Sequence, residues 1–298
     1  MRTRNLGGRE NKEQFNMEIQ NDILKEVIKK RKSVSHKGNY GKLLLIGGSS
    51  HYGGAIIMAA EGALNSGAGL LCVATHNINV TALHSRDPEI MFLDWRDEAG
   101  LQQLIPQMDV IVCGMGLGAE KRSIKCMELL RDTVSADQTV VLDASALTLI
   151  SKDKSLIPYN AGHIILTPHQ MEWERMSQLR INYQTDAANF EALDNLFPGK
   201  NAFLVLKSNH TKIYDQQRHV LMNPLGNPGM ATGGMGDTLA GIIGGFCGQF
   251  STSMNTIAAA VYLHSLAGDV IFKDEYVVRP TKLSSLLPHL MKNVVKNK

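Results

Sequence analysis

Cysteine is scarce in this chain, and its arrangement excludes two classes of site. The four cysteines among 298 residues are Cys72, Cys113, Cys126 and Cys247. No two of them have the Cys-x-x-Cys spacing of a zinc or redox site, and all lie in apolar stretches. We therefore expect buried free thiols of the kind found in a reducing compartment, and a cytoplasmic protein.

Long apolar runs and strong charge are also missing. No segment reaches the roughly 18 consecutive apolar residues of a membrane span. Residues 1–16 are polar and charged, unlike a secretory signal. A net charge of +3 is too small for the basic surface that nucleic-acid binding requires. We expect neither a membrane nor a nucleic acid as partner, whereas an anionic small molecule fits.

Several catalytic motifs are absent as well. The sequence contains no Gly-x-x-x-x-Gly-Lys-Ser/Thr, no His-Glu-x-x-His and no Gly-x-Ser-x-Gly, which excludes a P-loop NTPase. Residues 114–118 read Gly-Met-Gly-Leu-Gly, but the third glycine and the later acidic residue are wrongly spaced for a dinucleotide fingerprint. This loop is interpreted only as one that a ligand can approach closely.

Short apolar runs alternate with helical patterns along the chain. The expected strands are 42–46, 70–75, 109–113, 139–143, 164–167, 202–207, 212–214 and 219–222. The expected helices are 17–31, 55–66, 121–134, 170–178, 185–196, 238–248, 253–272 and 281–295. This alternation predicts an α/β fold, with a largely parallel sheet covered by helices on both faces. We expect one domain, 17–298, after an unstructured extension, 1–16.

Most of the expected strands end in glycine or in a polar residue. In open α/β sheets the ligand crevice lies beyond the carboxyl ends of the strands. The residues at these ends are Gly47, Gly48, Gly114, Gly116, Asp143, Thr167, His169, Lys207 and Asn223. We expect them to line one crevice.

The stretch Gly233-Gly-Met-Gly-Asp237 leads into a helix and carries the strongest chemical signal. Glycines at a helix N-terminus leave backbone N–H groups open to an anion. Asp237 beside such an anion is suited to take a proton from a neighbouring hydroxyl group. The alternative is that Asp237 only caps the helix, which is a common use of aspartate.

Two further stretches have both a chemical and a structural interpretation. Lys207-Ser-Asn-His-Thr211 follows a strand, where a lysine can bind phosphate, but it also fits a solvent-facing turn. His169 follows Pro168 at another strand end and can point into the crevice, or it can simply begin the next helix. The glycine loops around residues 36–41 and 47–55 fit either ligand contact or a flexible connection.

Together these stretches resemble a known family. Gly233-Gly-Met-Gly-Asp-Thr-Leu resembles the anion hole and catalytic aspartate of the ribokinase-like superfamily, with its three-layer α/β/α fold. Further stretches resemble the ADP/ATP-dependent NAD(P)H-hydrate dehydratases: His36-Lys-Gly-Asn-Tyr-Gly, Gly54-Ala-Ile-Ile-Met-Ala-Ala, Leu166-Thr-Pro-His and Asn223-Pro-Leu-Gly-Asn-Pro-Gly-Met-Ala. The resemblance extends over residues 33–292.

The resemblance implies a lyase that repairs hydrated NADH or NADPH. In this family a nucleotide phosphorylates the hydroxyl group of the hydrated nicotinamide, and the phosphate then leaves. Asp237 would be the base, and Gly234, Met235 and Gly236 the anion hole. The nucleotide would contact Lys207, Ser208, Asn209, His210, Thr211 and Gly236, and the hydrated cofactor would contact Ala55, Gly116, His169 and Asp237. ADP (or ATP) with phosphate-bridged Mg²⁺, and a homo-oligomer, typically a tetramer, are expected.

Three departures from the family pattern stand out, at Met235, at Ser208 and at Gln170-Met171 after Thr-Pro-His. Met235 leaves the backbone N–H donors of the anion hole unchanged. After Gln170-Met171, Glu172 stands at the position where the family pattern has an acidic residue. The chain has no room for the epimerase domain that some members carry, so we expect dehydratase activity alone. The alternative function is a ribokinase-like kinase of a vitamin-precursor alcohol, and a non-catalytic nucleotide sensor is the third.

Overall fold

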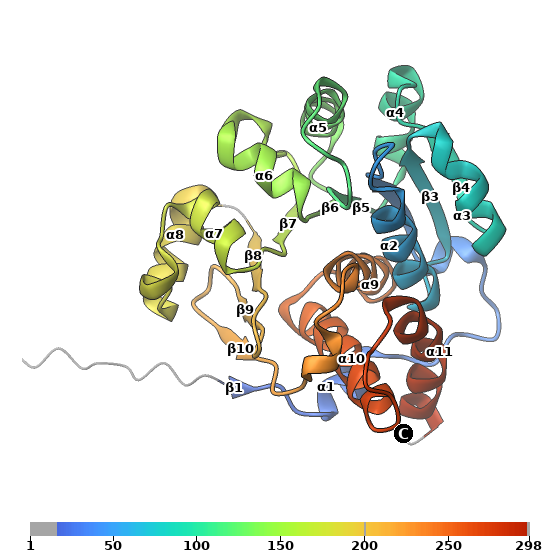
Figure 1. Cartoon of the computed structure of the whole chain (residues 1–298), viewed down its shortest axis with the longest axis vertical. Helices are drawn as coiled ribbons and strands as arrows, with labels where there is room; N and C mark the ends of the chain where they lie inside the picture. The colour runs from blue at the N-terminus through green and yellow to red at the C-terminus, as the bar shows by residue number, and fades with distance from the viewer. Residues whose placement is uncertain (1–16, 200, 297–298) are drawn as a thin grey trace, which may run out of the picture.

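The computed structural model describes residues 17–199 and 201–296. Its ten-stranded sheet has the order β1-β10-β9-β8-β7-β6-β5-β2-β3-β4, and within it only β9 pairs antiparallel to its neighbours. This confirms the predicted α/β fold with a mostly parallel sheet flanked by helices (Figure 1). The extension predicted at 1–16 lies outside the described residues.

The strands and helices have the following bounds. The strands are β1 Met17–Glu18, β2 Lys42–Ile46, β3 Leu70–Thr75, β4 Met91–Asp94, β5 Val110–Cys113, β6 Thr139–Leu142, β7 His163–Leu166, β8 Ala202–Leu206, β9 Lys212–Tyr214 and β10 Val220–Met222. The helices are α1 Asp22–Val27, α2 Gly53–Asn65, α3 Val80–Arg86, α4 Glu98–Leu104, α5 Lys121–Thr133, α6 Ser145–Lys152, α7 Gln170–Ser177, α8 Asp186–Leu196, α9 Met235–Phe250, α10 Met254–Phe272 and α11 Pro280–Lys296.

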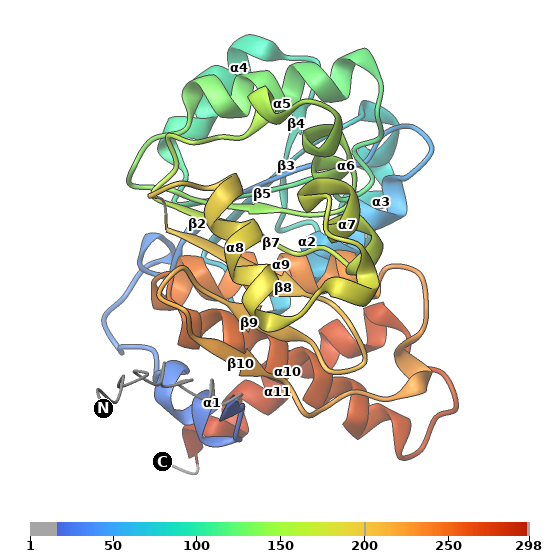
Figure 2. The ribbon, with the colours of Figure 1, turned by 90° about the vertical axis from the view of Figure 1, so that its left-hand side faces the viewer.

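Side-chain alternation along the strands divides the core into two layers. Leu43 and Leu45 of β2 face a cluster formed with α1, α2, α3, α9, α10 and α11. Leu44 and Ile46 face the other cluster, which contains α4, α5, α6, α7 and α8. Because each strand is apolar on both faces, the sheet lies between two helical layers (Figure 2).

The direction in which strands are added to the sheet changes between β2 and β5. The chain runs from β2 outward to β3 and β4, and then returns so that β5 pairs with the other side of β2. The loops that follow these two strands are joined by backbone hydrogen bonds, Gly48 N–H to Met115 O at 2.9 Å and Ser49 N–H to Gly116 O at 2.7 Å. Such a switch in strand order is where open α/β sheets bind ligands.

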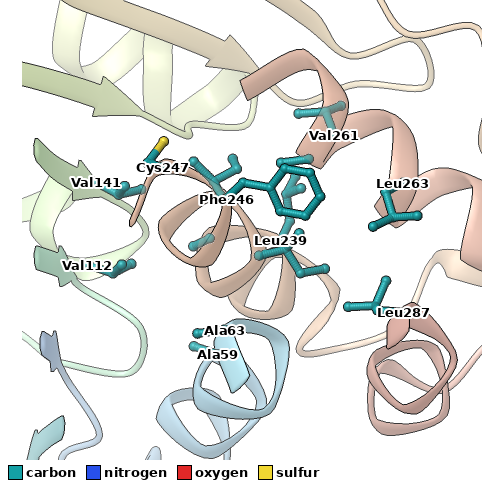
Figure 3. Packing of buried hydrophobic residues seen from close by; sticks show 14 of the residues in the cluster. Ala59, Ala63, Val112, Val141, Leu239, Phe246, Cys247, Val261, Leu263 and Leu287 are labelled. Carbon is teal, nitrogen blue, oxygen red and sulfur yellow. The ribbon is translucent and has the colours of Figure 1, made fainter. Parts of the chain in front are cut away.

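Helix α9 is the central helix of its layer. Its residues Leu239, Phe246 and Cys247 are buried among side chains of the sheet and of α2, α10 and α11 (Figure 3). Its glycines let α2 approach closely, since a Cβ on Gly241 would lie 1.9 Å from the carbonyl oxygen of Ala59. The small residues after Asp237 therefore fix the distance between α9 and α2.

We expect Gly241→Ala to destabilise the fold by about 2 kcal/mol, because the added methyl group forces the α2 backbone to move. Gly54→Ala is the matched control, since Gly54 is also helical and a Cβ there has no atom within 4 Å. That change should leave the free energy of unfolding unaltered or raise it by up to about 1 kcal/mol. Chemical denaturation measures both, and equal stabilities of the two variants would contradict the packing argument.

Several sequence predictions of secondary structure are wrong in part. The helix predicted at 17–31 is instead the short strand β1, paired with β10, followed by α1, Asp22–Val27. Helix α9 begins at Met235, not at residue 238. The prediction missed β4 and the helices α3, α4 and α6. The other predicted strands and helices are present, with ends that differ by a few residues.

One described helix is long and apolar enough to cross a membrane by length and composition alone. Helix α10, Met254–Phe272, has a mean hydropathy of 1.2, and 72% of its window is buried inside the protein. It packs against α9 and α11, so burial in the core accounts for its composition.

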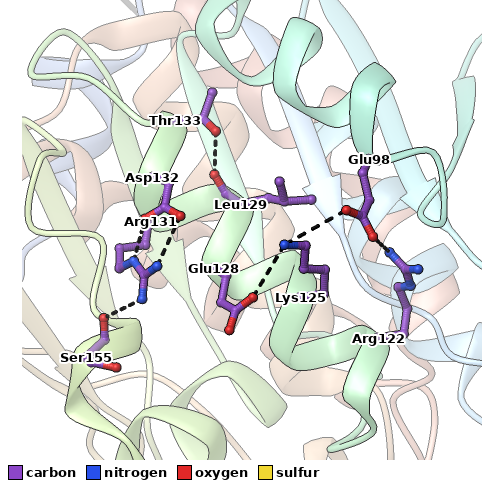
Figure 4. Close-up of polar contacts among 9 residues, drawn as sticks. All are labelled: Glu98, Arg122, Lys125, Glu128, Leu129, Arg131, Asp132, Thr133 and Ser155. Atoms are coloured by element: carbon purple, nitrogen blue, oxygen red, sulfur yellow. Dashed lines mark hydrogen bonds and ion pairs between the residues drawn. The ribbon is translucent and has the colours of Figure 1, made fainter.

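Polar contacts on the outer surface join α4 to α5. Glu98 of α4 pairs with Arg122 at 2.8 Å and with Lys125 at 3.9 Å, and Lys125 also reaches Glu128 at 3.7 Å (Figure 4). These side chains are largely exposed, so each pair contributes at most about 1 kcal/mol. These ion pairs lie on the outer side of the helices and do not line the crevice.

Candidate active site

The mouth of α9 has no side-chain cap. Gly234 is the N-cap, with φ +93°, a left-handed conformation that residues other than glycine rarely adopt. A Cβ on Gly234 would also meet the end of the Met58 side chain. The first N–H groups of a helix have no acceptor within it and point outward. The N–H groups of Met235 and Gly236 thus have no acceptor within the helix, and their role as an anion hole stays a prediction.

Asp237 is the third residue of α9, so the interpretation of Asp237 as the N-cap is wrong. Burial, followed by the negative charges of Asp143 and Glu172, raises the pKa of Asp237 to about 6, against an opposing effect of Lys207. A carboxylate with this pKa is ionised at neutral pH and can also accept a proton readily. These are the properties of a general base.

Lys207 follows β8 and points toward the mouth of α9. Its Nζ lies 2.8 Å from Oδ1 of Asp143, and a Cβ on Gly236 would be 3.2 Å from the same nitrogen. Burial lowers the pKa of Lys207, but the carboxylates of Asp143, Glu172 and Asp237 outweigh burial and raise it. The ammonium group therefore remains charged next to the open helix mouth.

A cavity of about 240 Å³ adjoins this lysine and the first turn of α9. Its lining includes Lys207, Ser208, Asn209, Thr211 and Gly236, which were predicted to bind a nucleotide. The remaining predicted residue, His210, is exposed and not among the lining residues. The segment is also a compact turn, with the Ser208 hydroxyl donating to the carbonyl of His210 at 2.7 Å. The interpretation of this segment as a turn is therefore correct, and its binding of a nucleotide stays a prediction.

The opposite wall of the cavity comes from α10 and from the loop after β10. Asn223 donates through Nδ2 to the Ser265 hydroxyl at 2.8 Å, which ties that loop to α10. His264 is 5% exposed, and its Nε2 has no hydrogen-bond partner within the described chain. Burial lowers the pKa of His264 to about 4, so its ring is neutral at neutral pH. This wall can meet the uncharged part of a ligand.

His169 caps α7 and lies beside Lys207. Its Nδ1 accepts the Glu172 backbone N–H at 3.3 Å, while Oε2 of Glu172 accepts the His169 N–H at 2.9 Å. The structural interpretation of His169 is therefore correct. The ring is nevertheless half exposed, and an isolated bridge pairs His169 with Lys207. Since Nδ1 is an acceptor, a neutral ring carries its proton on Nε2.

Ala55 and Gly116 lie together at the β2–β5 end of the crevice. A Cβ on Gly116, whose φ is +62°, would be 3.0 Å from the Ala55 Cβ and 2.4 Å from the carbonyl oxygen of Tyr52. The loop is joined to the next strand as well, because a Cβ on Gly114 would be 1.8 Å from the carbonyl oxygen of Asp143. The predicted substrate residues thus come from the loop after β5, the loop after β7 and the first turns of α2 and α9.

Asp143 and Thr167 were predicted to line the crevice but were given no chemical role, and His264 was not predicted at all. Asp143 and Thr167 directly follow β6 and β7, and Thr167 donates to Oδ1 of Asp143 at 2.8 Å. Their position at strand ends was the available signal. His264 lies in the middle of an apolar helix, and nothing in the local sequence distinguishes it.

Comparison with known proteins finds a matching family model, similar sequences and similar solved structures. A family model described as NAD(P)H-hydrate dehydratase matches residues 43–289. A Lactiplantibacillus plantarum protein named ADP-dependent (S)-NAD(P)H-hydrate dehydratase is 45% identical over 273 residues, 92% of this chain and 96% of that protein. A solved ribokinase-like superfamily protein from Enterococcus faecalis is 42% identical, with a TM-score of 0.87 over 99% of this chain and 100% of that one. The Bacillus subtilis ADP/ATP-dependent NAD(P)H-hydrate dehydratase, co-crystallised with ATP/Mg²⁺, is 29% identical, with a TM-score of 0.79 over 91% of this chain and 96% of that one.

Proposed function

The chain belongs to the NAD(P)H-hydrate dehydratase family, and on that premise we propose that it restores NADH or NADPH from their hydrates in an ADP-dependent reaction. One observation carries the proposal: Asp237, with a pKa of about 6, lies at an open helix mouth beside the Lys207 ammonium group. A base, an anion site and a cation at one place suit phosphoryl transfer to a hydroxyl group.

The reaction that we propose has two steps. In the first, the ring hydroxyl attacks the terminal phosphorus of ADP, its proton passes to Asp237, and AMP leaves. In the second, the electron pair of the ring nitrogen expels the phosphate from C6, and C5 loses a proton to restore the double bond. Phosphate is the better leaving group, so the nucleotide makes loss of the hydroxyl group feasible. The products are NAD(P)H, AMP and phosphate.

We assign each residue a part in these steps. The N–H groups of Met235 and Gly236, with Gly234 as cap, hold the transferring phosphoryl group, and Lys207 neutralises its charge. The cavity that Lys207, Ser208, Asn209 and Thr211 line takes the nucleotide. Ala55, Gly116 and His169 contact the hydrated nicotinamide cofactor, to which His169 offers its Nε2 proton.

Magnesium has no protein cage in the described part of the chain, where no group of three or more His, Cys, Asp or Glu side chains could hold a metal. Mg²⁺ in nucleotide sites is commonly bound by phosphate oxygens and water. We therefore assign the ion to the nucleotide, where it would neutralise phosphate charge, and we give no side chain of this protein as its ligand.

A ribokinase-like kinase would share the base and the anion hole. The family membership favours the dehydratase, and the two functions differ in product. A kinase leaves a stable phosphate ester, whereas the dehydratase releases phosphate and AMP. We also propose that the protein is cytoplasmic and forms a homotetramer, as the resemblance to the family implies. Light scattering in solution would measure the number of subunits.

The direct test is to incubate the protein with hydrated NADH and Mg²⁺, with ADP and ATP in separate reactions. We expect the near-ultraviolet absorbance of the dihydronicotinamide to recover with ADP, with one AMP and one phosphate formed per NADH. Hydrated NADPH in parallel shows which cofactor is preferred. Absence of recovery with both nucleotides would exclude the proposed function, and a stable phosphorylated product would favour the kinase.

A further inference from the structure

Asp143 is held in place by all its neighbouring strand ends. Its side chain is 1% exposed, and its Oδ1 accepts both the Lys207 ammonium and the Thr167 hydroxyl at 2.8 Å. Its backbone N–H donates to the carbonyl oxygen of Cys113 at 3.0 Å. The close approach of Gly114 to its carbonyl oxygen leaves no room for a side chain there. The carboxylate therefore has a fixed position.

The backbone beside Asp143 is strained. Ala144, the N-cap of α6, has φ +47° and ψ −111°, which residues other than glycine seldom adopt. Conformations of this kind are unfavourable and persist only where the surroundings impose them. Here they hold the turn that carries Asp143.

A buried carboxylate is unfavourable in a site for phosphate, because it repels the anion. Its contact with Lys207 offsets this cost. A free lysine side chain has several rotatable bonds, whereas Asp143 fixes its Nζ 2.8 Å away and next to Gly236. The cation is thus already in place at the mouth of α9 when the phosphate arrives, and preorganised charge of this kind stabilises transition states most.

We propose that Asp143 is a positioning residue for the dehydration: it fixes the Lys207 ammonium beside the mouth of α9 and places a negative charge next to Asp237. The inference rests on the proposed function. It assigns to Asp143 no contact with the substrate, since Asp143 acts through Lys207 and Asp237.

The charges around Asp237 determine whether its pKa rises or falls when Asp143 is replaced. Asp143 at the end of β6 and Glu172 of α7 raise the pKa of Asp237, while Lys207 at the end of β8 lowers it. The neutral His264 of α10 faces the same helix mouth. Asp143→Asn removes a negative charge and frees Lys207 from its partner. Both effects stabilise the ionised form of Asp237, so its pKa should fall.

The experiment compares Asp143→Asn, Asp143→Glu and the wild type. In Asp143→Asn we expect kcat to fall on the order of 10²-fold, because the lysine loses its position. The acidic limb of the kcat/KM profile should move down by about one pH unit. In Asp143→Glu the charge remains, so the limb should stay near pH 6 while kcat still falls. Asp186→Asn is the matched control: Asp186 holds Lys212 at 2.8 Å outside the site, and its loss should leave the limb unmoved.

Carbon-13 NMR of the Asp237 carboxyl group measures the midpoint of its titration without substrate. The signal is assigned by comparison with the Asp237→Asn variant. An unmoved midpoint in folded Asp143→Asn would overturn the inference and leave Asp143 as a structural partner of Lys207. If Asp143→Asn does not fold, the inference is tested with Asp143→Glu. A retained titration midpoint of Asp237 with a reduced kcat in that variant supports the inference, and a full kcat overturns it. Failure of the wild type to restore NADH would instead remove the proposed function, while the NMR result still reports the coupling of the two carboxylates.

Discussion

Replacing Asp237 by asparagine should lower kcat by about 10²–10⁴-fold while leaving the fold and nucleotide binding intact, which is the usual scale for a positioned base. Asparagine has nearly the same shape and retains the first turn of α9, but it cannot take the proton of the hydroxyl group. The wild type should lose activity as the pH falls through about 6, the pKa of Asp237, because the protonated carboxyl is no base. The variant should lack this limb.

The same substitution should stabilise the protein in the absence of ligands. The pKa of Asp237 is about 6 in the fold against 3.8 for an ordinary aspartate, so the folded state binds the proton more tightly. Its favourable effect on stability is present below pH 3.8 and is lost as the pH rises through 6. Asp237→Asn should therefore be more stable than the wild type above pH 6, by about 3 kcal/mol.

Chemical denaturation at pH 5 and pH 8, together with steady-state kinetics, checks both effects. Asp137→Asn is a suitable control for the stability measurement, since Asp137 is exposed in the turn between α5 and β6, outside the group around Asp237. Near-normal kcat in folded Asp237→Asn would remove Asp237 as the base. A stability difference that is the same at both pH values would contradict the pKa.

Lys207→Met is the second change with a large expected effect. Methionine keeps the length and the apolar stem but removes the charge from the helix mouth. We expect kcat to fall by about 10²–10³-fold, as when one donor is removed from an oxyanion hole. The variant also leaves Asp143 buried without its cation, which should cost about 3 kcal/mol of stability.

The pH profile separates these two contributions of Lys207. Loss of its positive charge should raise the pKa of Asp237, so the acidic limb should move above pH 6, opposite to the change expected for Asp143→Asn. Lys212→Met is the matched control, because Lys212 pairs with Asp186 at the same 2.8 Å distance. A limb that stays in place in Lys207→Met would show that the lysine does not act on Asp237.

Much of the fold follows from local patterns in the sequence. Runs such as Leu43–Ile46 are apolar on both faces, which only a strand between two helical layers accommodates. The N-terminal segment is a different case. Its spacing of apolar residues fits a helix over 17–31, but pairing of Met17 and Glu18 with β10 competes with the helix for the same backbone groups. The secondary structure of such a segment depends on residues that are distant from it in the sequence.

The start of α9 shows the same limit at the site itself. The glycines before Asp237 have low helix propensity, so the sequence placed the helix start at residue 238. Packing against Met58 and α2 extends the helix back to Met235 and turns Asp237 from a possible cap into a residue of the first turn. Its chemistry depends on this shift, because the N–H groups now lie before the carboxylate.

By itself the sequence determined the layered α/β fold, the row of strand ends and, through its motifs, the family and the aspartate at the helix mouth. Only the tertiary structure decided that Asp143 holds Lys207, that burial raises the pKa of Asp237, and that His264 lies in the wall of the cavity beside Lys207. The physical reason is that charge coupling and desolvation depend on distances between separate strands and helices. Those distances are set by packing, which no local pattern records.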